Sequence, residues 1–410
     1  MAELHPFHGL LPATERAAQV AAVPYDVVST REAAELAAGN PFSFLHVSRP
    51  EIDLEPGIDL HDEKVYRQAA DAFRKLCETV PLTLDAGEHL YIYQLEMNGH
   101  VQTGILGAAS AAEYRSGVIR KHEKTRQDKE DDRTRHVMEL RSHTGPAFFT
   151  YRDRESIDKL VAAECEKKPL FNFTAPDGIR HTLWRIDEET SRKLSALFRD
   201  EVPVFYIADG HHRSAAAART AAECAPKNPN HTGKEDYNYF LTVAFPASQL
   251  RILPYNRVVR TLNHNTPAAF LTRLSENFQV SPAADGETSA PGEFKFYLAH
   301  EWYLARPKFD LSKLGVIERL DVSILQDNVL APILGIDDPR TSKEIDFIGG
   351  IRGTAELEKL VNSGKYEIAF SMYPTTVEQL MAIADAGAIM PPKSTWFEPK
   401  LRDGLVCHNF

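Results

Sequence analysis

The segment 202–222 constrains the fold of this chain more than any other stretch. Residues 202–208 are apolar and rich in β-branched and aromatic side chains, which predicts a buried strand. Residues 215–222 are mostly alanine, the best helix former, and predict a helix. Between them lies the polar string Asp-Gly-His-His-Arg-Ser, residues 209–214. Free backbone N–H groups and the positive end of the helix dipole meet at such a junction and bind anions, phosphates above all. We therefore expect the functional centre there.

Length, charge and cysteine usage narrow the class of protein. The 410 residues suggest two or three domains, and 43% hydrophobic with 26% charged residues is typical of a globular chain. The net charge of -11 argues against a general nucleic-acid or membrane-surface binder. The four cysteines lie far apart with no Cys-x-x-Cys pair, which argues against a zinc ribbon or a disulfide framework. With no apolar run of membrane-span length and no signal-peptide pattern, we expect a soluble cytoplasmic protein. Whether copies form a homo-oligomer stays open.

Alternating strand-like and helix-like patterns predict an α/β (α+β) fold. We expect an N-terminal α/β domain over residues 1–115, a central domain over 116–260 that carries the polar string, and a C-terminal α/β domain over 261–410. Asn98-Gly99 is a strong hairpin signal.

Several shorter segments also carry local signals. Asp187 is expected to cap a helix with Glu189 in its first turn. Residues 42–47 are a strand candidate, and residues 152–181 are expected to be irregular.

The most charged stretch, residues 119–136, also predicts a helix. On a helix, Glu123, Arg126 or Gln127, Glu130 and Arg133 would share one face. A solvated helix with i,i+4 ion pairs is the simpler interpretation. However, the stretch lies between two strand-like segments, which favours a helix that lines a cleft for an anionic ligand.

The polar string has two structural alternatives to a phosphate site. Asp209 could cap the helix while His211 and His212 are surface residues, or the histidines could bind a metal. Adjacent histidines on a turn do not easily face one ion, and no third ligand is obvious, so metal ligands stay unknown. Residues 349–353, Gly-Gly-x-x-Gly, are a weak dinucleotide signal that a tight strand-to-helix turn explains better.

These residues also carry a family resemblance. The string from Tyr206 to Arg213 resembles the phosphate-binding motif of the ParB/sulfiredoxin superfamily, most of all its free-serine kinase branch. Over nearly its whole length the chain also resembles the domain of unknown function 1015 family, through residues 24–29, 40–47, 121–133 and 390–400. The resemblance implies a ParB/sulfiredoxin-like nucleotide-binding core over 116–260.

The resemblance implies a kinase that transfers a phosphoryl group from ATP or ADP to the hydroxyl of free L-serine, with Mg²⁺ bridging the phosphates. A glutamate before the motif would accept the hydroxyl proton, and Glu123 matches best, with Glu130 as second choice. The implied site is catalytic at Glu123, Asp209 and His212; phosphate-binding at Gly210, His211, Arg213, Ser214, Lys121 and Arg126; and substrate-binding at Lys129, Arg133 and Glu130. Backbone amides of 210–214 would hold the phosphates, and His211, His212 and Arg213 would stabilise the charge in transfer.

Three alternatives remain at this stage. The protein could be a non-catalytic nucleotide-binding regulator, a kinase for another small hydroxyl compound, or a reductase that uses the turn at 349–353.

Overall fold

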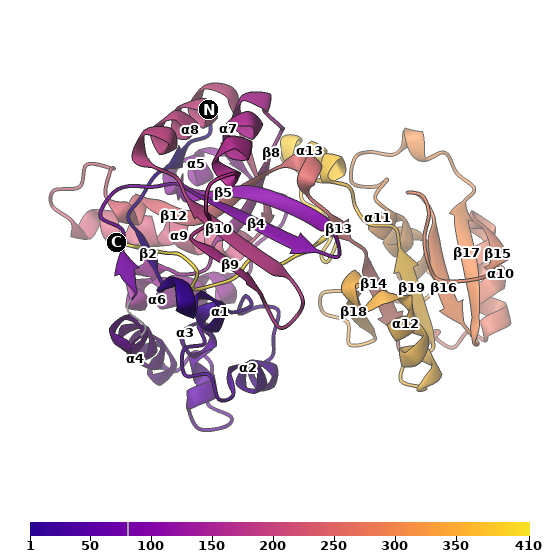
Figure 1. Cartoon of the computed structure of the whole chain (residues 1–410). Coiled ribbons are helices and arrows are strands. Elements are labelled where there is room, and N and C mark those ends of the chain that lie inside the picture. Colours follow the sequence, from indigo (N-terminus) through magenta and orange to yellow (C-terminus); the bar gives the residue numbers. More distant parts are fainter. Residues whose placement is uncertain (80–81) are drawn as a thin grey trace. The chain divides into compact units, whose positions relative to one another are not determined.

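The computed structural model describes residues 1–79 and 82–410 and divides the chain into two compact units (Figure 1). Unit 1 contains residues 1–250 and 399–410, and unit 2 contains residues 251–398. The predicted α/β class is confirmed. The three expected domains are not what the chain forms, because residues 1–115 and 116–250 share one sheet and the final residues return to unit 1.

A nine-stranded mixed sheet is the centre of unit 1. Its order is β6-β11-β8-β12-β5-β4-β10-β9, and β1 pairs with β5. β6 runs parallel to β11 and β8 parallel to β12, whereas the other pairs are antiparallel. The strands are β1 Leu4–His5, β4 Tyr91–Met97, β5 His100–Ser110, β6 Ile119–Arg120, β8 Ala147–Tyr151, β9 Phe171–Thr174, β10 Arg180–Arg185, β11 Phe205–Asp209 and β12 Tyr239–Pro246.

Helices of unit 1 enclose two apolar cores. The larger joins the sheet to α7, α8 and α9, and the smaller joins α2, α3, α4 and α6. The helices are α1 Ala17–Val20, α2 Thr30–Ala37, α3 Leu45–Ser48, α4 Glu63–Thr79, α5 Ala111–Ser116, α6 Gln127–Leu140, α7 Glu155–Cys165, α8 Glu188–Glu201 and α9 His211–Cys224. A second sheet, in the order β3-β2-β21-β7, contains β3 Thr83–Leu84, β2 Gly9–Leu11, β21 Cys407–Asn409 and β7 Ser142–His143. It ties the last residues of the chain into unit 1.

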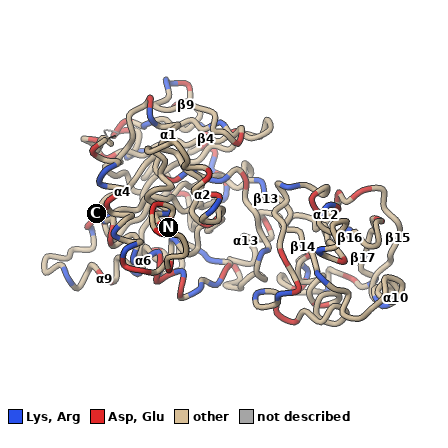
Figure 2. Tube along the Cα trace, turned by 90° about the horizontal axis from the view of Figure 1, so that it is seen from below, with Lys and Arg blue, Asp and Glu red and all other residues tan. Residues whose placement is uncertain are grey.

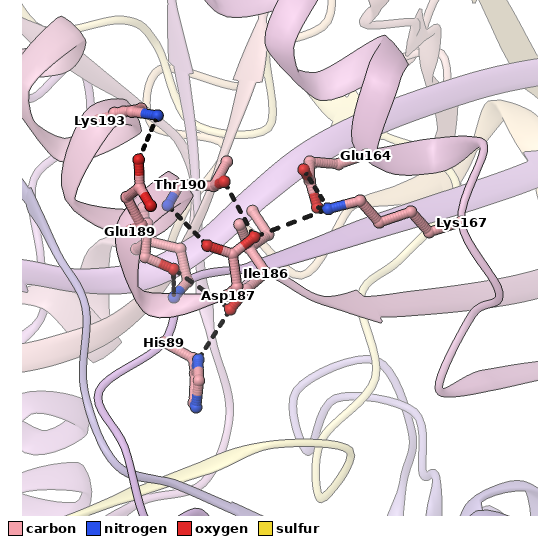
Figure 3. Close-up of polar contacts among 10 residues, drawn as sticks. His89, Glu164, Lys167, Ile186, Asp187, Glu189, Thr190 and Lys193 are labelled. Carbon is pink, nitrogen blue, oxygen red and sulfur yellow. Dashed lines mark hydrogen bonds and ion pairs between the residues drawn. The ribbon is translucent and has the colours of Figure 1, made fainter.

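Two local predictions are confirmed in unit 1. Asn98 and Gly99 have positive φ angles of 51° and 77° and join β4 to β5 as a hairpin. Asp187 caps α8: its carboxylate accepts hydrogen bonds from the backbone N–H and the hydroxyl of Thr190, both at 2.9 Å (Figure 3). Glu189 lies in the first turn, where a negative charge favours the helix dipole.

Three secondary-structure predictions are wrong. Residues 42–47 enter the short helix α3 instead of a strand, since a short apolar run alone does not distinguish the two. Residues 152–181 are not irregular, because they contain α7 and β9. The charged helix begins at Gln127, so Glu123 and Arg126 precede it instead of sharing its face.

Unit 2 is built on a six-stranded antiparallel sheet in the order β15-β17-β16-β19-β14-β18. The strands are β14 Tyr255–Val259, β15 Phe278–Ala283, β16 Phe294–Leu298, β17 Glu301–Pro307, β18 Ile345–Gly349 and β19 Ile368–Met372. A separate pair joins β13 Ile252–Leu253 to β20 Trp396–Phe397, beside the two ends of the unit. The helices are α10 Pro267–Asn277, α11 Asp321–Leu325, a π-helical turn Gln326–Leu330, α12 Gly353–Asn362 and α13 Val377–Asp385.

Close packing explains the first two glycines of the turn at 349–353. A Cβ on Gly349 would lie 2.9 Å from the Trp396 ring, and one on Gly350 would lie 2.6 Å from Pro254. The turn connects β18 to α12, as the tight-turn interpretation predicts.

Basic and acidic residues are interspersed over both units (Figure 2). Among the described residues, none of the helices combines the length and the apolar character that a bilayer span requires.

Candidate functional site

Parallel pairing of β6 with β11 brings two distant segments to one sheet edge. Ile119 lies opposite Phe205 and Arg120 opposite Tyr206. Because the carboxyl ends of parallel strands point the same way, residues 121–126 and the string at 209–213 leave the sheet side by side. The chain between the two segments forms α6, α7 and α8 among other elements, and then comes back to the same edge of the sheet as β11.

Gly210 makes the turn from β11 into α9. Its φ of 91° is left-handed, and a Cβ there would lie 3.3 Å from both the Ala147 Cα and the Arg213 Nε. Any other residue would be strained, which fixes glycine at the start of the helix. The first backbone amides of α9 have no acceptor in a preceding helical turn, and such amides can bind an anion.

Asp209 is held on both carboxylate oxygens. Oδ1 accepts the Gly210 N–H at 2.8 Å and Oδ2 pairs with the Lys400 ammonium at 2.8 Å. Burial alone would raise the pKa of this carboxyl, but Lys400 and Arg213 hold it well below its usual value. Asp209 is thus a fixed negative charge that shapes the turn, and it is a poor proton acceptor.

Arg213 is the central cation of the site. It donates to the Pro146 carbonyl, while its Nε is buried without a hydrogen-bond partner. Burial would lower its pKa, yet Asp26, Asp209 and Asp403 raise it, so the guanidinium is charged. One arginine therefore faces three carboxyl groups from three separate segments.

Two neutral histidines, His122 and His211, pack against each other at this junction. The His122 and His211 rings meet edge to face with centroids 4.4 Å apart, and both residues are buried. Burial lowers the pKa of His122 to about 4, and burial together with His122 lowers the pKa of His211 well below its usual value. His211 can therefore donate a hydrogen bond but does not supply the positive charge expected from the sequence.

Glu123 lies against this pair. Its Oε2 is 3.7 Å from the Nδ1 of His211, the first residue of α9, and its side chain is 51% exposed. A carboxylate that is open to solvent on one side and faces the helix N-terminus on the other can meet both a substrate and the phosphates.

His212 connects the motif to the start of α6. Its Nε2 accepts the Arg126 N–H at 3.1 Å, so that nitrogen carries no proton. Burial lowers the pKa of His212, which agrees with a neutral ring.

The other residues predicted to form the site make contacts with residues outside the polar string 209–214. Lys121 lies over the Tyr114 ring at 4.2 Å, Arg126 pairs with Asp128 at 2.7 Å, and Lys129 is half-buried on α6. Glu130 accepts the Thr125 hydroxyl, and Arg133 stacks on Tyr25 at 4.0 Å.

Ser214 is fully buried, and both its N–H and its hydroxyl donate to the Gly210 carbonyl. Its donors are used within the helix, so the phosphate-binding role predicted for Ser214 is wrong.

Four residues of the site were not predicted: Asp26, His122, Lys400 and Asp403. The first three lie in the segments that carried the family resemblance, which is the signal that could have found them. Asp403 had no such signal. It reaches the site because the residues after 399 return to unit 1, where Asp403 pairs with Ala22 as an isolated bridge.

Asp403 makes stability depend on pH. Burial raises the pKa of its carboxyl to about 7, although Arg213 lowers it, and its Oδ1 is buried without a partner. Between about pH 4 and 7 the folded protein keeps this proton while the unfolded chain loses it, so stability falls as pH rises. In Asp403→Asn, the free energy of unfolding should fall less steeply with pH, by up to about 1.4 kcal/mol per pH unit. Urea unfolding between about pH 4 and 7 measures this difference.

Asp187→Asn is the matched control. The N-cap hydrogen bond from Thr190 lowers the pKa of Asp187. This variant should therefore change the slope of the free energy of unfolding against pH only below about pH 4, where the wild type gains stability as pH rises. If the free energies of unfolding of the wild type and of Asp403→Asn change in parallel from about pH 4 to 7, Asp403 is ionised in the folded protein, and the raised pKa assigned to it is wrong.

The fold and the site define a mixed α/β protein in which a left-handed glycine joins a buried strand to the N-terminus of a helix. A family model described as "Protein of unknown function (DUF1015)" matches residues 4–323, which are 320 of the 410 residues. The chain belongs to this family. No curated protein matches the chain.

Solved structures show only distant likenesses. A conserved hypothetical protein from Pyrococcus furiosus has 14% identity and a TM-score of 0.35, covering 73% of this chain and 94% of its own. A free serine kinase in complex with AMP has 13% identity and a TM-score of 0.35, covering 72% and 86%. SbnI from Staphylococcus aureus, with a C-terminal truncation, has 10% identity and a TM-score of 0.38, covering 72% and 82%. At these scores the likenesses assign no activity to the chain.

Proposed function

We propose that this protein is a small-molecule kinase that transfers a phosphoryl group from ATP or ADP to the hydroxyl of free L-serine, giving O-phosphoserine. The observation that carries the proposal is the position of Glu123, with Oε2 3.7 Å from His211 at the start of α9. A carboxylate thus lies beside the N-terminus of a helix whose third residue is the half-buried Arg213, and phosphoryl transfer needs such parts. A ParB/sulfiredoxin-like core over 116–260 belongs to the same proposal.

The residues take distinct roles in this reaction. The terminal phosphate of the nucleotide lies on the first amides of α9 and on Arg213. Glu123 accepts the proton of the serine hydroxyl as its oxygen bonds to phosphorus. The bond from phosphorus to the nucleotide oxygen breaks, and ADP or AMP leaves. Asp209 and Lys400 hold the turn in place.

Magnesium fits the site only together with the nucleotide. Among the described residues, no group of three or more His, Cys, Asp or Glu side chains is arranged to hold a metal ion. Mg²⁺ in phosphotransfer sites is commonly held by one or two carboxylates and the phosphates themselves. Asp26, exposed and facing Arg213, would hold it, and the ion would neutralise phosphate charge.

An acceptor panel tests the substrate. The full chain with Mg²⁺ and either ATP or ADP is incubated with L-serine, L-threonine, L-homoserine, glycerol or no acceptor, and products are identified by mass spectrometry. We expect O-phosphoserine as the dominant product. A different phosphorylated hydroxyl compound would move the assignment to another small-molecule kinase. Nucleotide binding without any product would support the non-catalytic regulator.

A further inference from the structure

Unit 2 contains a cavity that the proposed kinase site does not use. Its volume is about 270 Å³, at the small end for ligand pockets. Apolar side chains form much of the wall: Val322, Leu330, Pro339, Phe347, Pro391 and Pro392. The polar residues of the wall are Arg257, Gln326, Asp337, Asp338 and Arg340. Most of this wall lies beyond residue 323, where the family model ends.

Arg257 is a buried cation without a counter-ion. It lies on β14 and is 3% exposed. Its guanidinium donates to the carbonyls of Tyr255 and Lys393, the latter at 3.0 Å, and no carboxylate of the described residues lies within ion-pair distance. Burial lowers the pKa of Arg257 to about 10, so the group is still charged at neutral pH. Apart from these carbonyls the guanidinium meets the face of the Phe347 ring, 5.5 Å from its centre, and neither neutralises its charge. A buried charge without a counter-ion is costly, and an anion in the cavity would offset that cost.

Gln326 presents an unused acceptor in the same wall. Its Nε2 donates to the Ile336 carbonyl at 2.8 Å, which fixes the amide, while its Oε1 is buried without a partner. A ligand N–H or O–H group would satisfy that oxygen.

The charges of the wall define the ligand further. Asp338 and Arg340 pair with each other at 2.7 Å. That leaves Arg257 and Asp337 as the unbalanced charges, one of each sign. A dianionic phosphate ester would meet Asp337 unfavourably, whereas a zwitterion complements both charges.

We propose that the cavity of unit 2 binds a free α-amino acid with an apolar side chain. The carboxylate pairs with Arg257, where guanidinium geometry favours two parallel hydrogen bonds. The ammonium group donates to the Gln326 Oε1 and faces Asp337. The side chain lies against Val322, Leu330 and Phe347. This proposal does not depend on the function of unit 1.

Calorimetric titration of the full chain tests the site. The ligands are alanine, valine, leucine and methionine, each compared with its amide, which lacks the carboxylate, and with inorganic phosphate. None of these amino acids has a hydroxyl, which separates this site from the acceptor site proposed in unit 1. At least one should bind, its amide should bind about tenfold more weakly or worse, and phosphate should not compete.

Two arginine variants locate the binding. Arg257→Met should weaken binding about tenfold or more, because a charge-assisted contact is lost. Arg260→Met is the matched control: Arg260 follows the same strand, pairs with Asp346 at 2.6 Å and does not line the cavity, so its affinity should equal that of the wild type. No binding by any of the four amino acids, equal binding of acid and amide, or unchanged affinity in Arg257→Met would overturn the proposal. If Arg257→Met does not fold, the acid-against-amide comparison on the wild type decides.

Discussion

Arg213→Ala should unfold at much lower urea concentration than the wild type and bind nucleotide poorly. The side chain faces Asp26, Asp209 and Asp403 together, so its loss leaves three carboxyl groups without their shared cation. Removing one partner from a buried charge cluster costs about 3–5 kcal/mol. Arg213 lowers the pKa of Asp209 and of Asp403, so without it both pKa values would rise in the folded protein, and the loss of stability should grow from acid to neutral pH. Affinity of the folded fraction for ATP or ADP should fall about 10- to 100-fold.

Arg126→Ala is the matched control for stability. Arg126 is 71% exposed, and among the described residues its side chain pairs only with Asp128, so the change should be below about 1 kcal/mol. If Arg213→Ala is as stable as Arg126→Ala at neutral pH, the three carboxylates do not depend on Arg213 and the proposed centre of the site is misplaced.

Glu123→Gln should keep nucleotide affinity and lose turnover by about 10²- to 10⁴-fold, the usual contribution of a positioned general base. Glutamine keeps the size and the hydrogen bonding of the side chain but cannot take a proton. Stability should hardly change, because the residue is half exposed. The measurement is the rate of phosphoester formation beside the dissociation constant for ATP or ADP.

Glu130→Gln distinguishes the two candidate bases. Glu130 accepts the Thr125 hydroxyl and lies 3.9 Å from Arg219, on the side of α6 that faces α9. We expect its turnover to stay within about threefold of the wild type, since its side chain is only 18% exposed and its carboxylate is already engaged by Thr125. Near-normal turnover in Glu123→Gln with a large loss in Glu130→Gln would assign the base to Glu130.

Local chemistry made much of unit 1 predictable. The strand β11, the turn and the helix α9 follow from an apolar run, a glycine and an alanine-rich segment, and each signal agrees with its neighbours. The same holds for the Asn98-Gly99 hairpin and the Asp187 cap. The strand predicted at residues 42–47 was wrong because packing of this short apolar segment on α4 decided its structure.

How the site assembles could not be predicted from the sequence, because its contacts join residues that are far apart in the chain. Glu123 meets His211 because a two-residue strand, β6, pairs parallel to β11, and no local pattern announces so short a strand. Lys400 and Asp403 meet the motif because the chain returns to unit 1 after unit 2. The charge state of His211 depends on burial beside His122, which the sequence of the motif does not reveal.

Phosphorus NMR of the wild type with Mg²⁺, L-serine and ATP or ADP tests directly whether the protein is a serine kinase. A phosphomonoester resonance of O-phosphoserine should grow as the terminal phosphate of one nucleotide disappears, and Glu123→Gln should shift the nucleotide resonances without forming the ester. Nucleotide resonances that shift in the wild type while no phosphoester forms from either donor would contradict the proposed serine kinase activity.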